Sequence, residues 1–339
     1  MRNTKKDETG VEAETGLPRL VIGVDGGGSK TAALLASVDT KGETVILGRG
    51  RGGPSNLFLA GKEQSLASLN QAIDEAMNTA GLTGQKLDYA VLALAGSTSP
   101  DVQRDVAEWA EQRGLSERFE IVHDVAPVLA MGAGQGEGVA LIIGTGSVSV
   151  GIGADGQSVL KGGWGHWFGD KGSGFYLGYK ALSAVAEASD EIGPETVLSE
   201  LVLKSLGTVD PRSILEKVLS GGDARREVAA LAPVVLEAAG NNDTVALRIV
   251  SHAVTEATKL VTAVVKSLGL DQPYPLAIAG GVICGSQYFR DELKKQLMLT
   301  DPQPSSVTVV DRPVLGCLKI AVNRLTNQVK PGASGSTGL

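Results

Sequence analysis

The chain has few cysteines, no long apolar run and no excess of basic residues. Its two cysteines, Cys284 and Cys317, have no partner at metal-site or Cys-x-x-Cys spacing, which excludes zinc ribbons, iron–sulfur clusters and a disulfide framework. No segment reaches the roughly 18 consecutive apolar residues of a membrane span. The 31 basic residues are outnumbered by 38 acidic ones, and nucleic-acid binding depends on basic residues that neutralise phosphates. We therefore expect a soluble, cytoplasmic protein with no nucleic-acid partner and no membrane partner.

Aromatic residues are also scarce, at 4% of the chain, whereas glycine is abundant. The 45 glycines make up about 13% of the 339 residues, against a usual value of roughly 7%. They follow no collagen-like period, so we expect them in tight turns and where the backbone approaches a ligand closely. Residues 1–19 carry charge but no apolar run, and residues 327–339 are rich in glycine and serine. These two ends are expected to be a disordered N-terminal arm and a disordered tail.

The first half of the sequence alternates short apolar runs with glycine turns and then with helical stretches. Three β-rich runs, at residues 20–25, 31–39 and 43–52, predict a meander of antiparallel strands. An amphipathic helix over Lys62–Ala80 is followed by a strand, a helix and a strand, at Tyr89–Gly96, Asp101–Arg113 and Phe119–Asp124. Three strands followed by alternating helix and strand are typical of an α/β domain.

The same pattern begins again after Asp124. The predicted order is a strand meander over 139–163, a mostly helical region over 199–268 that is clearest at Ala246–Leu268, a strand over Pro275–Ile283, a helix from Ser286, a strand over 306–311 and a closing helix over Val314–Leu325. We therefore predict two related α/β domains that face each other across a cleft. Residues 20–123 plus 313–326 form the first domain, and residues 124–312 form the second.

A glycine-rich turn follows the first predicted strand. Three consecutive glycines let the backbone approach a ligand so closely that successive N–H groups can converge on phosphate oxygens. Asp25, directly before them, would repel a bare anion, but it fits a site where it holds Mg²⁺, directly or through water. The segment matches neither GxGxxG nor GxxxxGK[ST], and an ordinary hairpin turn is the alternative interpretation. The phosphate-binding residues predicted here are Gly26, Gly27, Gly28, Ser29, Lys30 and Thr31.

Two further glycine turns support a phosphate site. The first lies at the matching strand–turn–strand place of the second half and consists of Gly144, Thr145, Gly146 and Ser147. Two such hairpins from facing domains could grip one polyphosphate from both sides. The second turn, at Gly280 and Gly281, ends a strand before a helix. Alone it would be an ordinary connection, but beside the other two it is better interpreted as a rest for the nucleoside.

The order of these motifs resembles that of one family. DGGGSKT, HD after a strand, GTGS, GGWGHWFGDKGSG and AGGV resemble the N-acetylglucosamine kinase group of the BadF/BadG/BcrA/BcrD ATPase family, in the sugar kinase, actin and heat-shock chaperone superfamily. The resemblance extends from about Val21 to about Leu325 and is most specific at Gly162–Gly174. It implies two ribonuclease H-like, actin-like ATPase domains that face an interdomain cleft. It also implies ATP and Mg²⁺ as cofactors, an amino sugar as substrate, and a homodimer.

The resemblance further implies roles for individual residues. Transfer of the γ-phosphoryl group of ATP requires positioning, a metal ion and a proton acceptor. Asp124 matches the family's catalytic aspartate, and a helix N-cap is its alternative role. The residues matched to sugar binding are Asn56, Asp124, Gly163, Trp164, Gly165, His166 and Asp170. Asn56 could instead be a turn residue after Pro54, and His166 is expected to hydrogen-bond the loop or the acyl group of the sugar.

Two positions depart from the family's pattern. Val148 follows GTGS, where an asparagine that helps to hold the sugar is found in vertebrate kinases, and Lys171 follows Asp170, where glutamate is usual. Both departures leave the phosphoryl-transfer chemistry intact and concern the choice of sugar. The Lys171 ammonium would disfavour the cationic sugar glucosamine if it lies near the sugar, and would have no such effect if it points to solvent.

The expected function is ATP-dependent phosphorylation of the 6-hydroxyl of N-acetylglucosamine. A glucosamine kinase is the nearest alternative. A second alternative is a conformational ATPase that activates a partner enzyme, although activators of this kind bridge a dimer through a cysteine-held iron–sulfur cluster that two unpaired cysteines cannot supply. A sugar-sensing regulator is a third alternative, but it would be expected to have lost the phosphate loops or the base.

Overall fold

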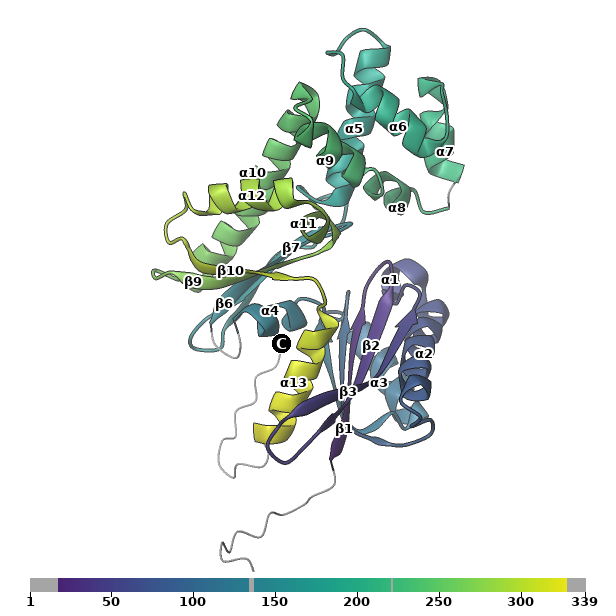
Figure 1. Ribbon diagram of the computed structural model, residues 1–339, viewed down its shortest axis with the longest axis vertical. Helices are drawn as coiled ribbons and strands as arrows, with labels where there is room; N and C mark the ends of the chain where they lie inside the picture. Colours follow the sequence, from purple (N-terminus) through teal and green to yellow (C-terminus); the bar gives the residue numbers. More distant parts are fainter. Residues whose placement is uncertain (1–17, 134–136, 221, 328–339) are drawn as a thin grey trace, which may run out of the picture.

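The computed structural model describes residues 18–133, 137–220 and 222–327. The chain forms two lobes, each built on a five-stranded sheet, one below the other in Figure 1. Most of the predicted arm and tail lies outside the described residues. At their inner ends, the first strand already begins at Arg19 and the last helix includes Asn327.

The sheet of the first lobe has the order β3-β2-β1-β4-β5. Its strands are β1 (Arg19–Gly26), β2 (Thr31–Val38), β3 (Thr44–Gly52), β4 (Leu87–Leu94) and β5 (Ser116–His123). The first three strands are antiparallel, as the meander predicts, whereas β4 and β5 run parallel to β1. Helices α2 (Lys62–Thr79) and α3 (Pro100–Arg113) bury their apolar faces in the core of this lobe. Two glycines of β3, Gly50 and Gly52, let the backbone of α2 approach the sheet, because a Cβ at either would lie about 2 Å from a helix carbonyl oxygen.

The sheet of the second lobe repeats this topology, with the order β10-β9-β6-β7-β8. Its strands are β6 (Gly138–Ile143), β7 (Ser147–Ile152), β8 (Ser158–Gly162), β9 (Tyr274–Ala279) and β10 (Pro304–Val310). Strands β6, β7 and β8 form an antiparallel meander, and β9 and β10 lie parallel to β6. The predicted α/β class and the structural repeat are therefore confirmed.

One predicted strand was too long. The sequence predicts a strand over Pro275–Ile283, but β9 ends at Ala279, and Gly281–Gly285 forms the short helix α11. The chain changes direction at Gly280, whose φ of +101° is a conformation that L side chains rarely adopt. The apolar residues Val282 and Ile283, which extend the β pattern in the sequence, belong to helix α11 and are buried there.

The second lobe also carries the larger set of helices, at the top of Figure 1. They are α5 (Gly174–Ser189), α6 (Leu198–Leu206), the 3₁₀ turn η1 (Pro211–Ser213), α7 (Ile214–Ser220), α8 (Ala224–Ala229), α9 (Ala232–Gly240), α10 (Thr244–Leu268) and α12 (Gln287–Leu297). Helices α6 to α10 confirm the mostly helical region predicted over 199–268, and α12 confirms the helix predicted from Ser286, whereas α5 precedes the predicted region. Among the helices of the described residues, none is long and apolar enough to cross a bilayer.

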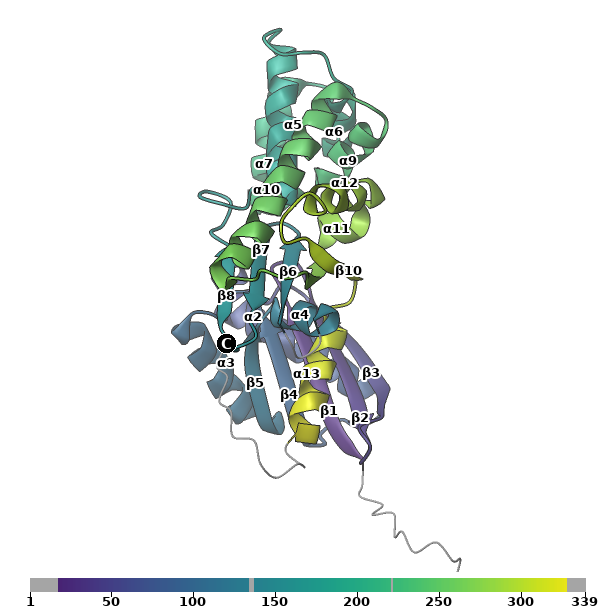
Figure 2. The ribbon, with the colours of Figure 1, turned by 90° about the vertical axis from the view of Figure 1, so that its left-hand side faces the viewer.

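Two helices occupy the space between the sheets, α4 (Ala126–Gly132) and α13 (Val314–Asn327) (Figures 1 and 2). Helix α4 packs against β9 and β10 of the second lobe, whereas α13 returns to the first lobe and packs against β1 and β4. The two helices touch closely, since a Cβ at Gly316 would lie 2.1 Å from the carbonyl oxygen of Pro127. The closing helix therefore joins the first lobe, as the predicted discontinuous domain requires, although the exact domain boundaries stay a prediction.

Candidate active site

The first glycine turn connects β1 to β2 and is fixed from behind. The N–H of Gly27 donates to the carbonyl of Lys30 at 3.1 Å, and the N–H of Ser55 donates to the carbonyl of Gly27 at 3.0 Å. The Thr31 hydroxyl lies 2.7 Å from the Gly53 carbonyl and 2.8 Å from the Ser55 hydroxyl. Residues 28–30 at the tip are exposed. The turn therefore presents free backbone groups on a fixed base, which suits the binding of a polyanion.

Asn56 lies beside this turn, at the start of the short helix α1 (Leu57–Ala60). Its side-chain oxygen accepts a hydrogen bond from the N–H of Phe58 at 3.0 Å, so it caps the helix. The Leu59 side chain reaches within 3.2 Å of the Cβ position of Gly28. The cap uses only the amide oxygen, so the amide nitrogen of Asn56 can still donate to a ligand. Its turn role is thus realised, and its sugar-binding role stays a prediction.

Asp25 is the last polar residue of β1 before the glycines. Burial and the nearby negative charge of Asp124 raise its pKa from 3.8 to about 7, and Lys30 opposes this shift. Two carboxylates in one low-dielectric region are costly without a cation. Mg²⁺ retains several waters and binds one or two carboxylates together with phosphate oxygens, so this pair fits it. No cluster of three or more His, Cys, Asp or Glu that could hold a metal occurs in the described segments, and a nucleotide-borne Mg²⁺ needs none.

Asp124 follows the end of β5, directly before α4. Its alternative role as a helix cap is not realised, because Val125 occupies the cap position and α4 has no side-chain cap. One carboxylate oxygen, Oδ1, is buried and makes no hydrogen bond with any described residue. The His123 Nδ1 atom lies 2.7 Å from it and itself faces the N–H of Val125. Within the described residues, Oδ1 of Asp124 is therefore a buried acceptor that makes no hydrogen bond, with His123 Nδ1 as a possible donor beside it.

The second glycine turn, between β6 and β7, is enclosed by the segment that follows β8. The N–H groups of Gly174 and Phe175 donate to the carbonyls of Gly144 and Thr145, at 2.7 and 3.2 Å. On the other side, the Ser147 hydroxyl donates to the carbonyl of Lys171 at 2.9 Å. The predicted sugar segment, residues 162–174, is thus joined to the predicted phosphate turn by several short hydrogen bonds.

Asp170 makes the most direct link between the two. It is only 4% exposed and has a left-handed φ of +52°. One carboxylate oxygen accepts a hydrogen bond from the N–H of Ser147 at 3.1 Å, and the other lies 3.3 Å from the guanidinium of Arg225. The absence of a side chain at Gly146 makes room for both oxygens, because a Cβ there would lie 2.9 Å from each. Asp170 therefore fixes the phosphate turn, whatever it also contributes to a sugar.

The aromatic residues of this segment are mostly exposed. Trp164, Trp167 and Phe168 are 76%, 81% and 87% exposed. His166 lies between two aromatic rings, with 4.8 Å from its ring centre to those of Trp167 and Phe175. Burial and, after it, the charge of Arg225 lower the pKa of His166. The loop thus offers an aromatic face next to Asp170, which is the kind of wall that carbohydrate sites use.

The third glycine turn lies against the second. A Cβ at Gly280 would be 2.3 Å from the carbonyl oxygen of Ile143, and the Cβ position of Gly144 lies 3.9 Å from the N atom of Gly281. Around Gly281 the Cβ position has no neighbour within 4 Å. Gly280 therefore packs tightly against the GTGS turn, and the open space lies at Gly281, where the predicted nucleoside rest would be.

The two residues that depart from the family's pattern have plain surroundings. Val148 is paired in the β-ladder and lies 3.6 Å from the Cβ position of Gly163. Lys171 is exposed. A hydrogen bond from Lys259 and, further, the charge of Lys171 lower the pKa of Glu256 on α10. Lys171 therefore lies within electrostatic reach of α10, and its effect on sugar choice stays a prediction.

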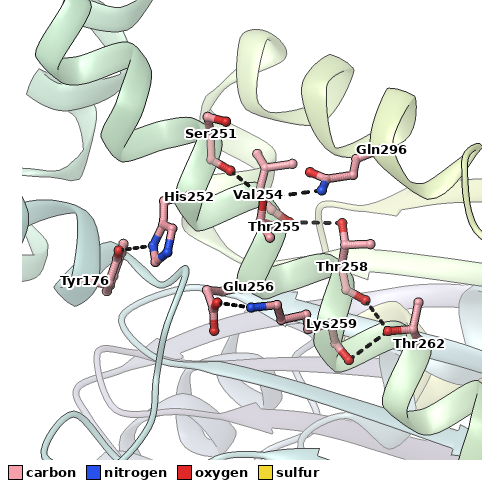
Figure 3. Close-up of polar contacts among 10 residues, drawn as sticks. All are labelled: Tyr176, Ser251, His252, Val254, Thr255, Glu256, Thr258, Lys259, Thr262 and Gln296. Atoms are coloured by element: carbon pink, nitrogen blue, oxygen red, sulfur yellow. Dashed lines mark hydrogen bonds and ion pairs between the residues drawn. The ribbon is translucent and has the colours of Figure 1, made fainter.

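Figure 3 shows the face of α10 on this side. Glu256 accepts a hydrogen bond from Lys259 at 2.6 Å, and the Tyr176 hydroxyl of α5 lies 2.5 Å from Nδ1 of His252. His252, for which the sequence suggests no function, thus has a structural partner. Lys180 lies over the rings of Tyr176 and Tyr179, at 5.9 and 5.8 Å. Of these contacts, the one between Tyr176 and His252 joins α5 to α10.

Sequence reasoning missed one residue of this region, Arg225. It lies on α8, 55 positions after Asp170, in a stretch that the sequence marks only as helical. A contact between residues so far apart has no periodicity or motif that could have revealed it. The candidate site therefore has two parts. The first turn, Asp25 and Asn56 belong to the first lobe, with Asp124 directly after β5, and the other two turns, Asp170 and Arg225 belong to the second lobe.

The two repeated sheets and the paired turns at their strand ends define an actin-like ATPase fold of the sugar-kinase type. The sequence model of the BadF/BadG/BcrA/BcrD ATPase family matches residues 22–310, and the chain belongs to this family. It is 31% identical to the N-acetylmuramic acid/N-acetylglucosamine kinase of Clostridium acetobutylicum, over 89% of this chain and 98% of the relative. It is 30% identical to the N-acetyl-D-glucosamine kinase of Dictyostelium discoideum, over 90% and 98%.

A solved structure agrees with these relatives. The crystal structure of an N-acetylglucosamine kinase from Chromobacterium violaceum has a TM-score of 0.71, with 26% identity over 90% of this chain and 99% of that one. The glucokinase of Streptomyces griseus, solved with glucose and an ATP analogue, shares the fold at a TM-score of 0.58 and 20% identity. Together with the family assignment, these similarities make the protein an ATP-dependent sugar kinase.

Proposed function

We propose that this kinase transfers the γ-phosphoryl group of ATP to the 6-hydroxyl of N-acetylglucosamine or a closely related amino sugar, with Asp124 as general base. The observation that carries this proposal is the buried Oδ1 atom of Asp124, an acceptor that makes no hydrogen bond within the described residues although His123 Nδ1 lies 2.7 Å away. A buried acceptor without a partner is costly. A substrate hydroxyl would supply the missing donor.

The proposed reaction is a single displacement. As the 6-oxygen of the sugar forms a bond to the γ-phosphorus, the hydroxyl proton passes to the Asp124 carboxylate and the bond from the γ-phosphorus to the β–γ bridging oxygen breaks, releasing ADP. The turns at residues 26–31 and 144–147 would bind the phosphates through backbone N–H groups, and Gly280 and Gly281 would support the nucleoside. Asp25 would hold Mg²⁺, directly or through water. The bound ion would neutralise charge on the phosphates.

The choice of sugar is supported by the relatives and by the composition of the loop. Both curated relatives are named as N-acetylglucosamine kinases, and one of them also as an N-acetylmuramic acid kinase. The proposed sugar contacts come from Asn56, from the backbone of Gly163 and Gly165, from Trp164 and His166, and from Asp170. Glucosamine is the alternative substrate. A conformational ATPase is the less favoured function. Such activators hold an iron–sulfur cluster through cysteines, whereas Cys317 is buried and Cys284 is partly buried.

The test is an ATP-consumption assay over a panel of hexoses and amino sugars, with wild type and Asp124→Asn. We expect N-acetylglucosamine to stimulate ADP release strongly over a low background. Asp124→Asn should lower kcat about a hundredfold or more, because a positioned general base contributes roughly 10²–10⁴, while the affinity for ATP changes little. Asp271→Asn, an exposed carboxylate, is the matched control. Rapid ATP turnover that no sugar affects would favour the conformational ATPase. Near-normal turnover by Asp124→Asn would show that Asp124 is not the general base.

The proposal also covers the cellular compartment and the partners of the protein. We propose that the protein acts in the cytoplasm and that it is a homodimer with no nucleic-acid or membrane partner. Light scattering coupled to size-exclusion chromatography would test the dimer, and a monomer that has full activity would contradict it.

A further inference from the structure

Helix α8 lies at the lower edge of the group of helices at the top of Figure 1. It packs on the start of α5 without intervening side chains, since a Cβ at Gly178 would lie 1.9 Å from the carbonyl oxygen of Val228. The first residue of α5, Gly174, donates its N–H to the GTGS turn at Gly144. One layer of backbone therefore separates α8 from the predicted phosphate turn.

The side chain of Arg225 connects α8 to the GTGS turn. Its Nη2 atom lies 3.3 Å from Oδ2 of Asp170, whose other oxygen accepts the N–H of Ser147 in the GTGS turn. The guanidinium is thus connected to the turn through a single carboxylate. The ion pair is long and involves one nitrogen of the guanidinium, whereas Arg–carboxylate pairs are frequently bidentate.

Arg225 also keeps a donor without an acceptor. Its Nε atom is buried and has no hydrogen-bond partner within the described ranges. Leaving a buried charged donor unpaired is more costly than leaving a neutral one unpaired. Only four buried side-chain polar atoms of the described residues are in this position. Two of them, Nε of Arg225 and Oδ1 of Asp124, belong to this one site and have opposite requirements.

These requirements match the two groups that react in a kinase. A hydroxyl donates, which suits Asp124, whereas a phosphoryl group in transfer only accepts and carries negative charge spread over its oxygens. A guanidinium with free N–H groups is the side chain best suited to such a group. Two lysines also lie at these turns, Lys30 at the tip of the first and Lys171 beside the second, and both are exposed.

We infer that Arg225 is a further catalytic residue, whose guanidinium binds the γ-phosphoryl group of ATP as it passes to the sugar. In the protein without ligands it rests against Asp170. With substrates bound, its free N–H groups donate to the phosphoryl oxygens and stabilise the charge that develops during transfer. This inference rests on the proposed function, because it requires that the phosphoryl group is transferred beside the GTGS turn.

The test compares Arg225→Gln, Arg225→Lys and Arg225→Ala with the same changes at Arg226, an exposed neighbour on the same helix. With N-acetylglucosamine, Arg225→Gln should lower kcat about a hundredfold and change the KM of the sugar less than threefold, since a donor to the transition state contributes roughly 10²–10³. Arg225→Lys should retain an intermediate kcat. Guanidinium chloride at millimolar concentration should restore part of the kcat of Arg225→Ala, and it should not raise the kcat of Arg226→Ala.

Three results would overturn the inference. A raised KM for the sugar with unchanged kcat would assign Arg225 to the sugar site. A loss confined to a sugar with a carboxylate, such as N-acetylmuramic acid, would assign it to that carboxylate. A loss that guanidinium cannot restore would make it a structural partner of Asp170. If the wild type transfers phosphate to a different sugar, the proposed substrate fails, and the same variants assayed with that sugar still test Arg225.

Discussion

Replacement of Asp25 by asparagine should stabilise the protein when no metal or nucleotide is present. Burial and the charge of Asp124 raise the pKa of Asp25 from 3.8 to about 7. Between these two values the folded chain holds a proton that the unfolded chain has released, so the free energy of unfolding falls as the pH rises. Below pH 3.8 both states are protonated and the effect disappears. Asparagine has the same shape and no charge, so it avoids this cost.

The size of the effect follows from the shift. Each pKa unit corresponds to 1.36 kcal/mol, so the shift to about 7 costs the wild type up to about 4 kcal/mol above pH 7. At pH 5 the cost is less than about 2 kcal/mol, because only the range from 3.8 to 5 contributes. Water reaches part of the Asp25 side chain, and solvent screening makes both figures upper bounds.

The assay is equilibrium urea unfolding of wild type and Asp25→Asn at pH 5 and pH 8, in EDTA and without nucleotide. The variant should be more stable at both pH values, with the larger gain at pH 8. In activity assays the same variant should show an altered dependence on Mg²⁺. Asp271→Asn reports the ordinary effect of changing an exposed carboxylate to an amide. A variant that gains nothing at pH 8, or a gain equal at the two pH values, would show that Asp25 is not a strained carboxylate.

Two further predictions concern a turn and a surface charge. Gly280→Ala should lose several kcal/mol of stability in urea unfolding and most of its ATP affinity, because the φ of +101° disfavours a side chain and the new Cβ would lie 2.3 Å from the carbonyl oxygen of Ile143. Gly285→Ala, with no neighbour within 4 Å, is its control and should be nearly neutral. Lys171→Glu should leave the ratio of kcat/KM for glucosamine and N-acetylglucosamine unchanged at low salt, because Lys171 is exposed and within electrostatic reach of Glu256. A severalfold gain for glucosamine would instead place the Lys171 ammonium near the sugar.

Much of the fold could be predicted because its signals are local. Strand-length apolar runs ending in glycine turns recur in both halves, and this repetition predicts the two sheets and the places of the glycine turns. The error at Pro275–Ile283 has a local cause as well. Val282 and Ile283 are as apolar as the strand before them, and only the left-handed conformation of Gly280 shows that the strand has ended.

The arrangement inside the site could not be predicted in the same way. The sequence places Asp170 in a sugar-binding segment, but not the buried, left-handed conformation in which both carboxylate oxygens face protein donors. Arg225 has no motif, and its partner is distant in the chain. The contact between Arg225 and Asp170 depends on how α8 packs on α5, and glycines at Gly174 and Gly178 allow that close packing.

The site contains three groups that the protein alone leaves in an unfavourable state. Asp25 has a pKa raised by burial and by Asp124, and, within the described residues, Oδ1 of Asp124 and Nε of Arg225 are buried without a hydrogen bond. A cation, a hydroxyl and a phosphoryl group would each relieve one of them, and these are the three components of the proposed reaction. Because each group is relieved by a different component, neither ATP nor the sugar alone would satisfy all three. The binding energy of the full set of substrates would therefore be used to complete the site, which is how an enzyme couples substrate recognition to catalysis.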